Sequence, residues 1–207
     1  MQNFMQHFTA GVVFSVVAVE ILPDIIKVHK PLFVILGFGL GVATMMVLKT
    51  ATSKLESKPL DSSAFPLAML MGVCVDILLD GFLIGIGFAA GAKEGVLLAS
   101  ALTLELLSLG IVVSIELSEM IRSKLKILSI NAGISSLVFI GAALGSVILS
   151  KASDTVIETV LSFGLAALLF LVTEELLVEA HRQPETPAST LAFFLGFLLF
   201  LVLGMMS

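Results

Sequence analysis

Long apolar runs alternate with short polar stretches along the whole chain. Seven runs stand out, each near the roughly 20 residues that a helix needs to cross the hydrocarbon core of a membrane. They lack the alternation in steps of two that a membrane β-strand shows, so helices are expected rather than a barrel. We predict spans at residues 8–26, 31–49, 66–90, 95–117, 128–150, 156–178 and 188–206.

Composition defines the class further. The chain has 207 residues, of which 58% are hydrophobic and only 13% charged, whereas soluble domains have about 25% charged residues. The expected fold is therefore an all-α polytopic membrane bundle, a single transmembrane domain over residues 1–207 with a polar loop at 50–65. The sequence has no basic patch that would favour nucleic acid, and its single cysteine, Cys74, excludes a disulfide framework.

Lysine and arginine residues are divided unequally between the two sides of the predicted membrane, with four on one side and seven on the other. Cytoplasmic loops carry an excess of these residues. We therefore expect a protein of the cytoplasmic membrane with the 50–65 loop and the N-terminus inside and the C-terminus outside. The four are Lys27, Lys30, Lys93 and Lys151, and the seven are Lys49, Lys54, Lys58, Arg122, Lys124, Lys126 and Arg182.

Three acidic residues interrupt the apolar runs far from any loop: Asp76 and Asp80 in the third run and Glu105 in the fourth. A carboxylate at mid-membrane costs about 2.5–3.5 kcal/mol on insertion scales, so each is a candidate functional group. Asp76 and Asp80 are one helical turn apart and share a helix face. Two ionised carboxylates so close repel each other, so they should take up a proton or share a cation.

The short connection at residues 91–95 makes the third and fourth helices antiparallel neighbours, which should bring Glu105 to the depth of Asp80. We predict a metal site formed by Asp76, Asp80 and Glu105, whose oxygen donors favour hard ions such as Mn²⁺, Mg²⁺ or Ca²⁺, and also Fe²⁺. The alternative is that these acids are protonated and hydrogen-bonded within the bundle. Further candidates along a transport route are Glu20, Ser108, Glu174, Glu175, Glu179 and His181.

Parts of the chain resemble each other. "FTAGVVFSVVAVEILPD" at residues 8–24 aligns without gaps with "FGLAALLFLVTEELLVE" at residues 163–179, which pairs Glu20 with Glu175. "DILLDG" at residues 76–81 aligns in the same manner with "ELLSLG" at residues 105–110. Many transporters are built from internal repeats, although matches this short also arise by chance in apolar sequence.

These segments together resemble the Zrt/Irt-like protein (ZIP) family of divalent-metal transporters. Members usually have eight spans, with His-Asn-x-Pro-(Glu/Asp)-Gly in the fourth and His-Glu-x-Pro-Glu-Gly in the fifth. Here "DILLDGFLIGIGFAAG" looks like the fourth span, "ALTLELLSLGIVVS" like the fifth, "AGVVFSVVAVEILPD" like the second and "FGLAALLFLVTEELLVEAH" like the seventh. The likeness covers nearly the whole chain, with the family's first span missing.

The usual motif histidines are replaced. Asp76 and Glu105 stand at the two histidine positions and Asp80 at the fourth-span acid position, while Leu106 and Leu109 replace the acids of the fifth-span motif. The resemblance therefore implies one metal site rather than two, and it leaves open that transport has been lost. It also implies a homodimer.

The sequence thus predicts a membrane transporter that moves a divalent cation of the zinc, iron or manganese class. We expect no enzymatic activity, because no nucleophile–base pair or cofactor motif stands out, and no tightly bound cofactor. Two alternatives remain: a non-transporting membrane protein with protonated structural carboxylates, and a proton-linked carrier that uses the same acids as a relay.

Overall fold

The protein is a helical bundle. The computed structural model describes residues 2–28, 30–56, 67–149, 152–181 and 186–206, and within them every element is a helix. Seven helices of this described part are long and apolar enough to cross a membrane, which confirms the predicted all-α polytopic fold. The elements are α1 (Gln2–Val16), η1 (Val17–Ile21), α2 (Leu22–Val28), α3 (Pro31–Glu56), α4 (Leu67–Ala90), α5 (Ala92–Met120), α6 (Lys124–Ser135), α7 (Leu137–Leu149), α8 (Asp154–Phe170), η2 (Leu171–Leu176), α9 (Leu177–His181) and α10 (Pro187–Met206).

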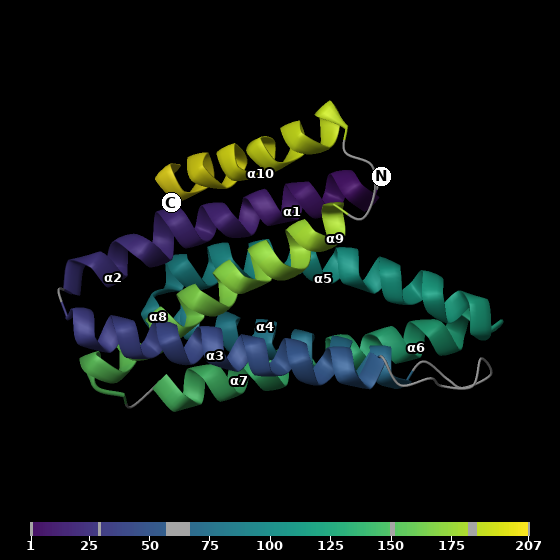
Figure 1. The fold of residues 1–207 in the computed structure, drawn as a ribbon, viewed down its shortest axis with the longest axis horizontal. Helices are drawn as coiled ribbons and strands as arrows, with labels where there is room; N and C mark the ends of the chain where they lie inside the picture. Colours follow the sequence, from purple (N-terminus) through teal and green to yellow (C-terminus); the bar gives the residue numbers. More distant parts are fainter. Residues whose placement is uncertain (1, 29, 57–66, 150–151, 182–185, 207) are drawn as a thin grey trace.

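The observed spans match the predicted ones within a few residues. The largest extension at one end of a span is at Asn3–Lys27, where 8–26 was expected. Helix α3 continues to Glu56, so residues 50–56 of the segment predicted as a loop are helical, and residues 57–65 lie outside the described part. The two termini lie at opposite ends of the bundle (Figure 1), as seven crossings require.

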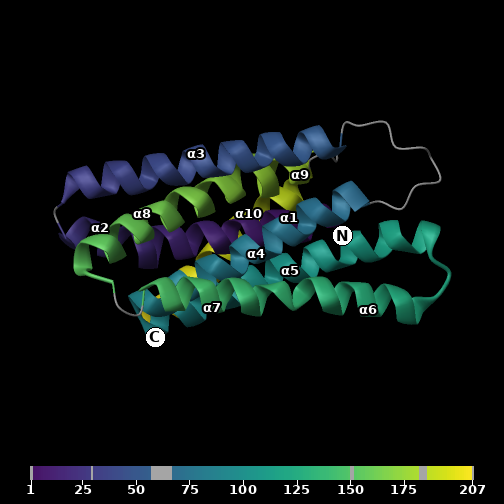
Figure 2. The same ribbon diagram turned by 90° about the horizontal axis from the view of Figure 1, so that it is seen from below.

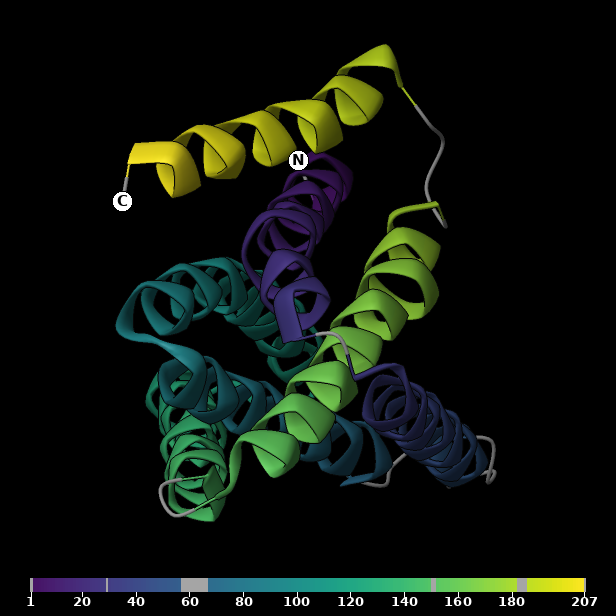
Figure 3. The same cartoon turned by 90° about the vertical axis from the view of Figure 1, so that its left-hand side faces the viewer.

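Three helices lie on the outside of the bundle, each packed on an inner partner. Helix α7 packs on α4, α10 on α1 and α3 on α8, and these pairs form the most extensive helix contacts in the described structure (Figures 2 and 3). The outer helices expose large apolar side chains such as Ile35, Phe139 and Phe194. A water-soluble surface rarely carries so much exposed apolar area, which indicates a multi-pass membrane protein whose outer helices contact lipid.

Glycines hold α4 and α7 close together. Gly81 and Gly85 of α4 face Gly141 and Gly145 of α7, and a Cβ atom on any of the four would overlap with backbone atoms of the opposite helix. Small residues allow this close approach where lipid provides no hydrophobic drive for association. The contact fixes the position of α4, the helix that carries Asp76 and Asp80.

Two inner helices each contain a π-helical turn. In η1 the Leu22 N–H donates to the carbonyl oxygen of Val17, and in η2 the Leu177 N–H donates to that of Val172. The internal alignment pairs Leu22 with Leu177 and Val17 with Val172, so the irregularity recurs at equivalent positions. A proline can cause such a turn, yet only η1 is followed by one, Pro23. Turns of this kind are frequent at functional sites.

Candidate carboxylate site

A cavity of about 390 Å³ opens at the end of the bundle that holds the N-terminus. Its wall comes from α1 (Gln6), α4, α5 and the η2–α9 segment, and we call it the vestibule. Five of its lining residues were singled out from the sequence: Asp76, Glu105, Ser108, Glu174 and Glu175. The vestibule therefore collects candidate groups from three separate helices at one place.

Four carboxyl groups form a cluster at the vestibule. Those of Asp76 and Glu175 lie close enough to share a hydrogen bond. Asp80 interacts electrostatically with both of them, and Glu105 interacts with the other three, most strongly with Asp80.

The inner part of the cluster is closed off from solvent. Asp80 is 2% exposed and Glu105 is 5% exposed, whereas Asp76 is half-buried and lines the vestibule. One oxygen of Asp80 (Oδ2) and one of Glu105 (Oε2) have no hydrogen-bond partner among the described residues. A buried charge without a partner is strongly unfavourable, so the cluster has capacity for protons or for a cation.

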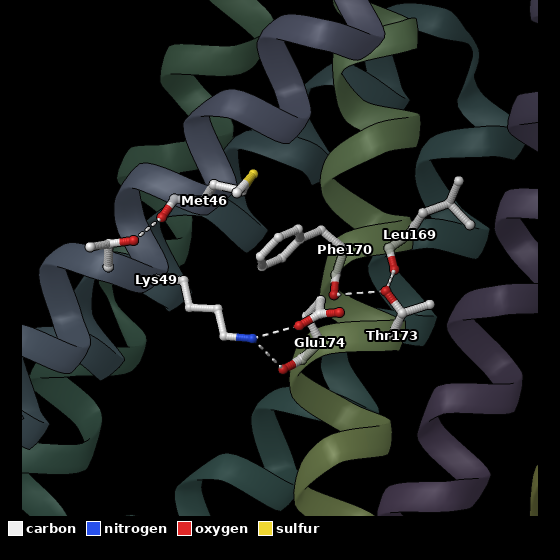
Figure 4. A network of polar contacts seen from close by, with 7 residues as sticks. Met46, Lys49, Leu169, Phe170, Thr173 and Glu174 are labelled. Atoms are coloured by element: carbon white, nitrogen blue, oxygen red, sulfur yellow. Dashed lines mark hydrogen bonds and ion pairs between the residues drawn. The ribbon is translucent and has the colours of Figure 1, made fainter.

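Among the described residues, Lys49 is a base at the edge of this cluster. Its ammonium group lies 2.6 Å from Glu174 Oε2 and 5.6 Å from the centre of the Phe170 ring, and it interacts electrostatically with Glu175. Figure 4 shows the lysine of α3 reaching toward Glu174 of η2. Both side chains of the ion pair are nearly half exposed, so one partly solvated base stands beside four acids of the cluster.

The described side chains do not form a ready ion cage. Among the described residues, no three His, Cys, Asp or Glu side chains stand close enough together to hold a metal ion. Asp76, Asp80 and Glu105 therefore remain a predicted site, and side-chain rotation would be needed to bring their oxygens onto one ion.

The other predicted route residues divide into two groups. Ser108 is 8% exposed in the vestibule wall, and His181 lies near the mouth, against His7. Glu20 lies away from the vestibule, where its Oε1 is 3.5 Å from Lys93 Nζ. The side chain of Glu179 lies outside the described part of the structure.

Sequence reasoning placed Glu175 on the route but not in the acid cluster, because it falls near the end of the predicted span 156–178. The pairing of Glu20 with Glu175 was the signal that an acid recurs at one place in a repeated segment. Gln6 was missed because only the fold brings the start of α1 to the vestibule wall.

A much smaller cavity lies toward the opposite end of the bundle. The cavity found there has a volume of about 10 Å³, room for about one water molecule, and its wall includes Leu83, Ile86 and Leu98. Two ion pairs join helices at this end. They are Lys93 with Glu20 at 3.5 Å and Lys30 with Glu158 at 3.6 Å.

Comparison of the chain with protein-family models finds no match, and comparison with curated proteins finds no significant one. Fold and site together define the class: a multi-pass helical membrane protein with a carboxylate cluster at a cavity that is open at one end of the bundle.

Proposed function

We propose that the protein is a carrier that moves a divalent metal cation across the cytoplasmic membrane, with its N-terminus inside. The main support for this proposal is the vestibule, whose acids come from α4, α5 and η2 and lie within apolar helices. Acids inside membrane spans mark ion and proton pathways in general, because their insertion cost needs a compensating role.

The chemistry of the cluster fits a hard divalent ion. Carboxylate oxygens suit Mn²⁺, Mg²⁺ and Ca²⁺, and they also bind Fe²⁺. Asp76, half-buried at the vestibule, would meet the ion first, and Asp80 and Glu105 would hold it deeper. Glu175 would complete the oxygen set from the third helix.

Access from one end only is what a carrier requires. Among the described residues the vestibule is wide, whereas the cavity toward the far end is small, lined largely by apolar side chains and accompanied by two ion pairs. Carriers work by alternating which end is open around a fixed site, commonly with repeats moving against each other. The ZIP resemblance supports the same function, and on that resemblance alone we add a homodimer. The proposal includes no enzymatic step and no resident cofactor.

A proton-linked carrier is the second candidate, and one observation favours it. A hydrogen bond shared by the carboxyl groups of Asp76 and Glu175 needs a proton on one of them. The same acids could then pass protons along a relay.

Uptake of a panel of divalent ions into proteoliposomes tests both candidates. The wild type is compared with the variant Asp76→Asn/Asp80→Asn/Glu105→Gln, which keeps the side-chain shapes but removes the charges. Saturable uptake that the variant loses supports the metal carrier. Proton flux that is independent of metal and lost in the variant supports the second candidate. Two well-folded proteins that move neither would overturn the carrier proposal.

A further inference from the structure

Two histidines from distant parts of the chain meet beside the vestibule. The rings of His7 and His181 have their centroids 5.4 Å apart at an interplanar angle of 53°. His7 lies near the start of α1 and His181 at the end of α9, and Figure 1 shows these helix ends side by side. Gln6 and Val178, near each histidine in sequence, line the vestibule, so the pair lies beside residues of its wall.

Both rings are oriented by the same kind of hydrogen bond. His7 Nδ1 lies 2.9 Å from the carbonyl oxygen of Asn3, and His181 Nδ1 contacts the carbonyl oxygen of Leu177. A carbonyl oxygen can only accept, so each Nδ1 must carry a proton and donate it. In a neutral imidazole the lone pair then sits on Nε2. Histidines that bind metals show this arrangement, with the second ring nitrogen donating to a carbonyl or carboxylate.

Asn3 supplies a further polar group at the same place. Its Nδ2 donates to the carbonyl oxygen of Ala180 at 3.0 Å, which ties the start of α1 to the end of α9. Its Oδ1 is buried and has no hydrogen-bond partner among the described residues. His7 is 4% exposed whereas His181 is exposed, so an ion could approach from the His181 side.

We propose that His7 and His181 form a binding site for a borderline divalent transition-metal ion such as Zn²⁺, Co²⁺ or Ni²⁺ at the vestibule mouth. Imidazole nitrogen suits these ions, whereas the deeper carboxylates suit harder ones. Two imidazoles bind an ion weakly enough for exchange, with water completing the coordination. The role of the pair as a loading point for the vestibule rests on the proposed function, but the binding itself does not.

The test measures Zn²⁺ binding to the purified protein by equilibrium dialysis. The background is the variant Asp76→Asn/Asp80→Asn/Glu105→Gln, which removes the candidate carrier site. We expect about one Zn²⁺ per chain, lost on adding His181→Gln or His7→Gln. His29→Gln, which alters the remaining histidine, is the matched control and should keep the ion.

A second measurement needs no change to the buried His7. Diethylpyrocarbonate should modify His181 in the wild type, and Zn²⁺ should protect it, as read by mass spectrometry. Zinc binding that persists in His181→Gln, or wild-type protein in which Zn²⁺ gives no protection, would overturn the site. Wild-type protein that binds zinc at the two histidines but takes up no ion would count against the carrier alone.

Discussion

The two π-helical turns have the same backbone and opposite surroundings. Glu20 of η1 and Glu175 of η2 are paired by the internal alignment, and each lies within a turn closed by an equivalent hydrogen bond. Glu20 faces a base, Lys93, at the end of the bundle opposite the vestibule. Glu175 faces other acids at the open vestibule.

The difference shows that the same π-helical turn can hold an acid in two different electrostatic environments. At η1 the lysine supplies the positive charge that the buried acid needs, so no ion from solution is required. At η2 the described base Lys49 is paired with Glu174, and on the proposed function the four clustered acids take up a proton or a cation. On that proposal the neighbouring groups, rather than the turn itself, decide whether the acid is neutralised by a lysine or binds an ion.

The comparison of the two π-helical turns is tested most strongly by replacing Glu175 and Glu20 one at a time. Glu175→Gln removes one negative charge from the cluster. Ion uptake should fall about tenfold or more, which is the effect typical of losing a group that supports a metal site. Glu20→Gln should keep most of the uptake, because its carboxylate lies away from the vestibule. Initial rates of metal uptake in proteoliposomes measure both, and equal losses in the two variants would contradict the distinction.

The packing around Glu20 offers a second way to break the comparison. A Cβ atom on Gly204 of α10 would lie 2.6 Å from Glu20 Oε1, so Gly204→Ala should push the carboxylate away from Lys93. The displaced atom is the end of a flexible side chain, so the cost should lie at the low end of the about 1–3 kcal/mol that overpacking costs. Gly39→Ala is the matched control, since a Cβ there meets nothing within 4 Å. Thermal unfolding in detergent should show a lower Tm for Gly204→Ala only.

Lys93→Gln should make the surroundings of Glu20 resemble those of Glu175, because it removes the base beside Glu20. The change leaves Glu20, 7% exposed in its side chain, without its base, and the loss should be about 1 kcal/mol because Lys93 itself is partly solvated. Added Mn²⁺ should then restore stability more in the variant than in the wild type, by binding the folded state. If Mn²⁺ does not change the unfolding temperature of the variant, Glu20 is protonated there rather than bound to an ion.

The fold could be predicted from the sequence because a membrane span depends only on the length and hydrophobicity of its own apolar run. About 20 consecutive apolar residues define a span whatever packs beside it, and all seven spans were found this way. The continuation of α3 to Glu56 was missed because polarity was taken to indicate a loop, whereas a helix can extend into water with polar residues.

The site was predicted only in part because it depends on helices that are distant in sequence. Asp80 and Glu105 could be related through the short α4–α5 connection, but Glu175 joins them through the packing of η2, which no local pattern encodes. No local pattern tells which helix the glycines of α4 and α7 face. The meeting of His7 with His181 likewise depends on tertiary structure.

Lys49 provides the finest test, because it is the one positive charge that we place beside the open cluster. Its pair with Glu174 is nearly half exposed on both sides, so Lys49→Gln should change the free energy of unfolding by less than about 0.5 kcal/mol. Uptake should respond more than stability does. Removing a positive charge near Glu175 lowers the repulsion felt by an incoming cation, which should reduce the KM for uptake about two- to threefold at low salt and less at high salt. Lys126→Gln, on the exposed surface of α6, is the control and should leave the KM unchanged. A raised KM in Lys49→Gln would mean that the lysine orients Glu174 for the ion rather than opposing the ion's charge.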